Sequence, residues 1–179
     1  QALAYAGIGA ALSRGGGDRG RRLDLLGSAM HSAVDHLASL TGFAYRGLDA
    51  ATFEPVFIDP DGRERFFDAL PTQARHLVAF AALATRLFWA AYPGQDPRTA
   101  EGVIAIDEVD LHLHPSWQLK VLPVLARALP RIQFIVTTHS PLVVGSLERG
   151  NILVARPSTR QSSNLRRISQ TVHGLDADQ

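Results

Sequence analysis

Two apolar runs rich in β-branched residues mark the second half of the chain, and each ends on chemically reactive side chains. The first run, residues 103–106, leads directly into Asp107 and Glu108, and the second, residues 132–136, leads toward His139. Runs of this length and composition predict strands of a parallel sheet that are buried on both faces. Because the carboxyl ends of parallel strands share one edge, the pattern predicts that the two acids and the histidine lie side by side.

Apolar positions that recur every three or four residues predict helices around these strands. Residues 23–40 form one amphipathic helix in this interpretation, and residues 72–92 are apolar on nearly every side, which predicts a mostly buried helix. Pro115 suits the first turn of a third helix that runs to Leu129. Pro123 lies inside that helix, and its missing N–H predicts a kink.

The remaining pattern predicts shorter elements and a division at residue 53. Residues 1–52 are interpreted as a helical segment with a glycine-rich linker, and residues 53–179 as one α/β lobe. The individual expectations are a helix over 1–12, the linker over 13–20, a hairpin over 53–67, a short helix over 142–147, strands over 151–155 and 165–172, and a serine-rich loop over 158–163. The arginines around that loop favour a solvated basic turn over a nucleic-acid contact.

Composition bounds the function classes. The chain has 179 residues, of which 46% are hydrophobic, so it can bury a sizeable core as one domain or one lobe. A net charge of +1 gives no support to a protein that coats nucleic acid. The absence of cysteine excludes disulfides and thiolate chemistry and is compatible with the cytoplasm. No apolar run reaches the roughly 18 to 20 residues of a membrane span, so no membrane partner is expected.

The glycine-rich segment does not supply a phosphate-binding loop. Such a loop needs glycines that let backbone amides surround the phosphates, followed by Lys-Ser or Lys-Thr. Lys120 is the only lysine in the chain, and it lies about a hundred residues downstream of linker 13–20. The chain also begins at Gln1 without a methionine. We therefore expect it to continue a longer sequence at both ends.

The motifs of residues 70–154 resemble those of ABC-type ATPases, most closely the RecF/SMC-like and OLD-like bacterial AAA family ATPases. Residues 103–108 resemble a Walker B motif, and residues 137–141 resemble an H-loop. The resemblance implies an α/β fold, namely the C-terminal lobe of a parallel-sheet P-loop NTPase, with a helical segment and a β-hairpin. It further implies ATP and Mg²⁺ as ligands, a head-to-tail dimer with a second ATPase subunit, and an N-terminal lobe that carries Walker A. DNA repair or antiphage defence, with DNA or a nuclease effector as partner, is the implied context.

The resemblance assigns roles to the acids and histidines. Asp107 would hold Mg²⁺ through a water molecule, since magnesium prefers hard oxygen ligands and keeps most of its waters. Glu108 would polarise the water that attacks the γ-phosphorus, and His139 would sense the γ-phosphate. Asp110 and His114 lie where the resembling ATPases have a D-loop that crosses the dimer interface.

The segment 70–75 aligns with the ABC signature motif but departs from it. Pro71 replaces the serine and Gln73 replaces the glycine that reach the γ-phosphate of the other subunit. The free amides of a helix N-terminus still favour an anion, and Thr72 offers a displaced hydroxyl. Arg75 suits either this recognition of ATP across the dimer or a plain surface charge, and both alternatives stay open.

Two other functions compete with the ATPase hypothesis. A metal-dependent hydrolase could use His112, His114 and His139, because His-x-His at a strand end is a common metal-ligand pattern. A non-catalytic interaction module is the second alternative. Since no lysine is available for Walker A, we expect the 179-residue chain alone to be inactive as an ATPase.

Overall fold

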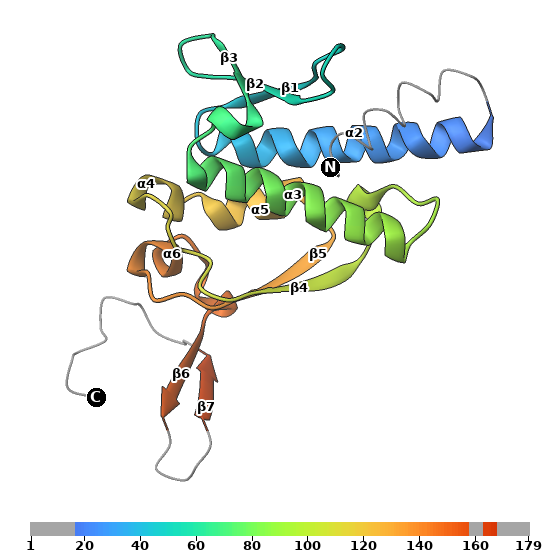
Figure 1. Ribbon diagram of the computed structural model, residues 1–179. Coiled ribbons are helices and arrows are strands. Elements are labelled where there is room, and N and C mark those ends of the chain that lie inside the picture. The colour runs from blue at the N-terminus through green and yellow to red at the C-terminus, as the bar shows by residue number, and fades with distance from the viewer. Residues whose placement is uncertain (1–16, 158–162, 168–179) are drawn as a thin grey trace.

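The computed structural model describes residues 17–157 and 163–167 (Figure 1). The long helices are α2 (Asp18–Ser39) and α3 (Thr72–Ala91). The shorter elements are strands β1 (Ala44–Leu48), β2 (Pro55–Ile58), β3 (Glu64–Phe66), β4 (Gly102–Ile106), β5 (Ile132–Val136), β6 (Leu153–Pro157) and β7 (Ser163–Arg167), and helices α4 (Pro115–Gln118), α5 (Val121–Ala128) and α6 (Pro141–Gly145). Single 3-10 turns lie at Phe67–Ala69, Pro97–Thr99 and Arg149–Asn151.

Strands β4 and β5 form a parallel pair that is covered by helices on one face (Figure 1). The register runs from Gly102 opposite Ile132 to Ile106 opposite Val136. Ala84 of α3 and Ala128 of α5 pack with Ile132 in one hydrophobic cluster. A Cβ added at Gly102 would lie 2.7 Å from the ring of Phe88, so only glycine permits this close approach of helix α3 to the strand. The predicted α/β fold with a parallel sheet is confirmed.

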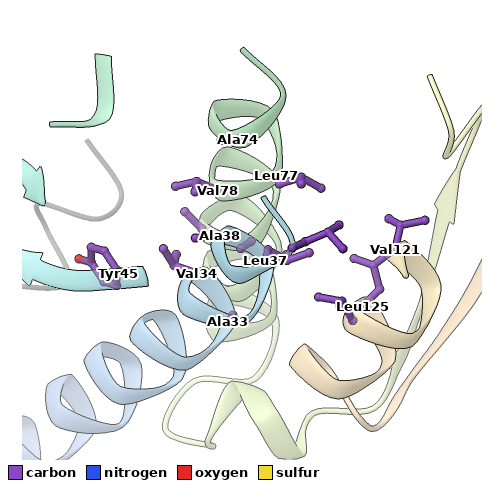
Figure 2. Close-up of a cluster of buried hydrophobic side chains, with 14 of the residues drawn as sticks. Ala33, Val34, Leu37, Ala38, Tyr45, Ala74, Leu77, Val78, Val121 and Leu125 are labelled. Carbon is purple, nitrogen blue, oxygen red and sulfur yellow. The ribbon is translucent and has the colours of Figure 1, made fainter. Parts of the chain in front are cut away.

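A larger core joins α2, α3 and α5. Figure 2 shows the side chains of Leu37, Leu77 and Leu125, one from each helix, converging on one another. Leu37 and Val78 are fully buried in this core. Burying a leucine of this kind stabilises the fold by about 1.5 to 3 kcal/mol relative to leaving it in water. The packing of the helices thus fixes the layer on which β4 and β5 rest.

The predicted hairpin belongs to a three-stranded antiparallel sheet with order β1-β2-β3. Strand β1 was not expected, because it lies within the segment 1–52 interpreted as helical. Its Tyr45 packs between His31 of α2 and Phe57 of β2, with ring centroids 4.9 and 5.2 Å away. Asp59 closes the following turn by accepting hydrogen bonds from Asp61 N–H and Arg63 N–H at 3.0 and 2.8 Å.

The predicted single helix from Pro115 to Leu129 is wrong. Helix α4 ends at Gln118, Leu119 and Lys120 form a turn, and the new helix α5 starts at Val121. Pro123 therefore lies in a first turn, where its missing N–H breaks no hydrogen bond. The N–H of Val124 makes the first bond, to Lys120 O at 3.0 Å. The proline ends one helix and permits another instead of kinking one.

The expected burial of β4 and β5 on both faces is also wrong. Strands β4 and β5 alternate between half-buried or buried and exposed residues, and Val103 and Ile135 are 57% and 56% exposed on the face opposite the helices. Helix α3 buries seven of its residues but leaves Leu83 and Leu87 more than half exposed. The apolar side chains at these positions predict burial. Within the part of the chain that the structure describes, no further layer covers them.

The segment boundaries at the two ends differ from the sequence interpretation. Asp18 and Gly20 already belong to helix α2, so the predicted linker 13–20 overlaps a helix. Strand β7 ends at Arg167, and the predicted helix 1–12, most of the loop 158–163 and the end of the strand 165–172 lie outside the described residues. No helix among the described residues is both long and apolar enough to cross a membrane.

Candidate functional site

The polar residues that follow β4 and β5 lie against one another at the carboxyl ends of these strands. The parallel ladder continues past the strands, because Thr137 N–H donates to Ile106 O and Val109 N–H donates to Thr137 O, both at 3.0 Å. Asp107 and Glu108 follow β4 directly, and both are exposed. The structure therefore brings the acid pair and the segment that carries His139, also exposed, to one edge of the sheet.

The two threonines before His139 hold the loop that follows β4. Thr137 Oγ1 donates to Asp107 Oδ1 and accepts a hydrogen bond from Glu108 N–H at 2.8 Å. Thr138 Oγ1 donates to Asp110 Oδ1 and accepts from Ser140 N–H at 3.0 Å. Hydrogen bonds to ionised carboxylates are stronger than neutral ones, so these contacts fix two acids of the loop.

The loop 107–114 turns sharply. Glu108 and His112 have backbone φ angles of 48° and 62°, which lie in the left-handed region that residues other than glycine rarely adopt. Leu111 N–H donates to Glu108 O at 2.9 Å, and Leu113 N–H donates to Asp110 O at 3.0 Å. Left-handed residues of this kind cluster at functional sites, where the surrounding structure holds them.

A second set of hydrogen bonds links the same loop to helix α6. Ser140 caps α6 by accepting from Leu142 N–H at 3.1 Å, and its hydroxyl donates to Gln118 Oε1 at 2.6 Å. The amide of Gln118 in turn donates to Leu113 O at 2.9 Å. Thus both ends of the loop 107–114 are tied to the segment 137–140.

The N-terminus of α3 borders a shallow hollow beside this loop. The hollow has a volume of about 600 Å³ and is lined by Gln73, His112, Leu113, His114, Ser116 and Trp117. Arg75 lies one turn into the helix, and its guanidinium donates to Thr72 Oγ1 at 3.3 Å. Gln73 of the segment 70–75 therefore shares this hollow with residues 112–114 of the loop, whereas Thr72 and Arg75 do not line it.

His114 has a local structural role in addition to its place in the hollow. Its Nδ1 accepts the N–H of Ser116 at 3.3 Å and lies 2.8 Å from Ser116 Oγ, which makes it the N-cap of α4. Its ring also packs 5.9 Å from that of Trp117. The cap engages Nδ1, so Nε2 is the ring nitrogen that remains available to a ligand.

The donor set fits magnesium better than a transition metal. Asp107 presents a carboxylate, and no hydrogen bond within the described residues engages its Oδ2. A single hard oxygen ligand suits Mg²⁺, which keeps several waters and takes phosphate oxygens as further ligands. Among the described residues, no three His, Cys, Asp or Glu side chains are grouped to hold a metal ion. The alternative with His112, His114 and His139 as ligands therefore lacks its ligand set here.

Sequence reasoning missed the residues that build the network around the acids. Thr137, Thr138 and Gln118 were assigned no role, although all three bond the loop 107–114 or the cap beside it. The signal in the sequence was the Thr-Thr pair directly after β5. Hydroxyl side chains at the end of one strand can reach the residues that follow the neighbouring strand. Which oxygen each hydroxyl meets depends on the strand register, and the sequence does not give that register.

Comparison with known families shows to which family the chain belongs. Residues 55–145, half of the chain, match the family described as "AAA domain, putative AbiEii toxin, Type IV TA system". The chain belongs to this AAA-domain family. The matched range contains the signature-like segment, the acid pair and the residues through α6.

Relatives of this AAA-domain protein are much longer than the chain. It is 35% identical over 125 residues to the Retron Ec83 probable ATPase of Escherichia coli, covering 69% of the chain and 23% of that protein. It is 49% identical over 55 residues to the Septu protein PtuA of Bacillus mycoides (strain KBAB4), covering 31% of the chain and 8% of that protein. The chain therefore spans less than a quarter of either relative.

Solved structures confirm the fold of this AAA-domain protein. An SMC ATPase from work on ATP-driven dimerization and DNA stimulated activation aligns with a TM-score of 0.55 at 18% identity, over 79% of the chain and 84% of that structure. The SMC head domain from Thermotoga maritima also gives a TM-score of 0.55 at 18% identity, over 92% of the chain and 52% of that structure. At this identity the likeness shows a P-loop NTPase-like fold.

Proposed function

We propose that this chain supplies the Walker B and H-loop half of an ATP hydrolysis site, and that a Walker A lobe outside its 179 residues supplies the phosphate-binding loop. The observation that carries the proposal is the hydrogen-bonded contact between two adjacent strand ends, where Thr137 bonds Asp107 and Glu108 two residues before His139. Family membership supports ATP as the nucleotide.

Each residue at this edge has a role that suits its chemistry. Asp107 would hold Mg²⁺ through a water molecule, and the metal would neutralise charge on the β- and γ-phosphates. Glu108, with an exposed carboxylate that no hydrogen bond or ion pair engages among the described residues, would accept a proton from the attacking water or orient it. His139 would donate to the γ-phosphate from the neighbouring strand end.

The surface formed by residues 70–75 and the loop 107–114 would face a second subunit in a head-to-tail dimer. Thr72, Gln73 and Arg75 at the N-terminus of α3 would approach the γ-phosphate held by the partner, since free helix amides favour anions. Asp110 and His114 would lie at the same interface. The name of the retron relative, a probable ATPase, supports ATP turnover, and the SMC ATPase of similar fold is described as DNA-stimulated. As part of the same proposal, the complete protein would act in cytoplasmic defence or DNA repair, with DNA or a nuclease effector as the further partner.

The steady-state ATPase rate of Glu108→Gln tests the proposal. The assay uses the protein in which this chain is joined to, or complemented by, a Walker A lobe. Since a positioned general base contributes about 100-fold or more, we expect kcat to fall by at least that factor. Glu54→Gln, an exposed glutamate before β2, is the matched control and should keep the parent rate. Unchanged hydrolysis in Glu108→Gln would remove Glu108 from the mechanism.

A further inference from the structure

Every polar group of Thr137 is directed at the four residues from Ile106 to Val109. Its N–H donates to Ile106 O and its carbonyl accepts from Val109 N–H, both at 3.0 Å. Its hydroxyl donates to Asp107 Oδ1 and accepts from Glu108 N–H at 2.8 Å. A hydroxyl has one proton and accessible lone pairs, so a single Thr side chain satisfies both neighbours at once.

The contact with Glu108 holds an unfavourable backbone conformation. Glu108 has φ of 48°, and a side chain at such a position points in a direction that an extended or helical residue would not give. Its N–H has the Thr137 hydroxyl as its acceptor. The same oxygen restrains the Asp107 carboxylate. One atom thus sets the orientation of both acids relative to each other.

We propose that Thr137 is a positioning residue for the acid pair, acting through the Asp107 carboxylate and the Glu108 backbone rather than on the nucleotide. This inference rests on the proposed function, in which Asp107 and Glu108 carry the chemistry. Residues that orient metal-binding or reacting groups typically change activity 10- to 100-fold when their contacts are removed. Because Thr137 is exposed, water can replace its hydroxyl and folding should tolerate the change.

The first measurement needs no nucleotide. Hydrogen exchange of the Glu108 amide, followed by mass spectrometry on the same Walker A-containing protein, should accelerate about tenfold or more in Thr137→Val. Thr137→Ser keeps the hydroxyl and should keep the protection. Thr99→Val removes a remote exposed hydroxyl, whose bond is to Asp96 O at 2.9 Å, and should leave the Glu108 amide unchanged. Equal exchange in Thr137→Val and the parent would overturn the inference.

The second measurement is the ATPase rate of the same variants. We expect Thr137→Val to lower kcat about 10- to 100-fold, with KM for ATP changed less than about threefold, and Thr137→Ser to recover most of the rate. If Thr137→Val fails to fold, Thr137→Ala takes its place in the comparison with serine. A serine variant as slow as the valine or alanine variant contradicts positioning by the hydroxyl.

Glu108→Gln separates this inference from the proposed function. If Glu108→Gln is slow while Thr137→Val hydrolyses ATP like the parent, the acid pair acts without help from Thr137 and only the positioning role fails. If Glu108→Gln itself hydrolyses ATP normally, the proposed function fails. In that second case the hydrogen-exchange result still reports whether Thr137 holds the Glu108 backbone.

Discussion

The side chains at the strand ends derive their geometry from contacts thirty residues away in the sequence. Asp107 and Glu108 could be picked as candidate site residues from the sequence, because two carboxylates directly follow an apolar run that predicts a strand. The left-handed φ of Glu108 could not be predicted from the sequence, since glutamate has no preference for that conformation. It exists because Thr137 and the β5 ladder hold the loop.

His139 provides a test of one side chain in the proposed site. If His139 senses the γ-phosphate, His139→Ala should lower kcat about 10- to 100-fold and weaken ATP binding only a few-fold, because its hydrogen bond strengthens as charge develops. Rates and equilibrium binding on the Walker A-containing protein check this. His36→Ala, in the last turn of α2, is the control. A variant that loses ATP affinity but keeps kcat would place His139 in binding alone.

The apolar pattern predicted a secondary structure element correctly where the packing in the fold agrees with the local preference of the residues for helix or strand. The helix at residues 72–92 and the strands at 103–106 and 132–136 were predicted closely, since their periodicity is long or their β-branched content high. Strand β1 was missed, because Gly47 and the polar Arg46 weaken its pattern and its pairing with β2 is what creates it. Pro123 predicted a disturbance of the helix over 115–129, but the sequence did not show that one helix would end at Gln118 and another begin at Val121.

The packing of α2 against its neighbours predicts a clear stability difference. Leu37 is 0% exposed between α3 and α5, so Leu37→Ala should lower the free energy of unfolding by about 2 to 5 kcal/mol through lost burial and a residual cavity. Leu83→Ala on the exposed side of α3 should cost less than about 1 kcal/mol. Urea denaturation followed by circular dichroism measures both values. Equal losses would contradict the placement of the core.

The contact between β1 and α2 predicts a loss of stability at alkaline pH. Burial raises the pKa of Tyr45 to about 12 in the folded protein, above its ordinary value of 10.0. Between pH 10 and 12 the unfolded chain therefore ionises Tyr45 while the folded chain keeps it neutral, and the free energy of unfolding falls by roughly 2 to 3 kcal/mol. Tyr45→Phe should remove that part of the fall.

Denaturation by urea at pH 8, 10 and 11 measures the alkaline effect. Tyr92→Phe is the matched control, because Tyr92 is exposed and its hydroxyl bonds Glu101 O at 2.9 Å. The control should keep the slope of the parent protein. A slope in Tyr45→Phe as steep as that of the parent would show that burial of Tyr45 does not produce it.

Within residues 17–157 and 163–167, one face of the sheet and the loop surface are open. Parallel sheets are normally covered on both faces, yet Val103 and Ile135 are more than half exposed. The chain also spans less than a quarter of its retron and Septu relatives. An additional lobe over the sheet is consistent with both observations. The sequence predicted the fold class because the two motif-bearing strands encode it locally, but it wrongly predicted burial because burial depends on neighbouring layers.

The isolated chain should lack the activity proposed for the complete site. Lys120, its only lysine, stands at the N-cap position of α5 and is not part of a glycine-rich loop, so no side chain replaces the Walker A lysine. We expect the 179-residue chain to show neither tight ATP binding by calorimetry nor phosphate release. ATP turnover by the purified chain that disappears in Glu108→Gln would contradict this expectation and place a complete site within it.

The nucleotide retained by Glu108→Gln tests the proposed site most directly. The variant of the Walker A-containing protein is incubated with Mg²⁺ and ATP, and its mass and bound nucleotide are then determined by light scattering and chromatography. Loss of the group that activates water should leave intact ATP trapped in a closed dimer. Bound ADP in Glu108→Gln, released at the rate of the parent protein, would contradict the assignment of Glu108 to the reacting water.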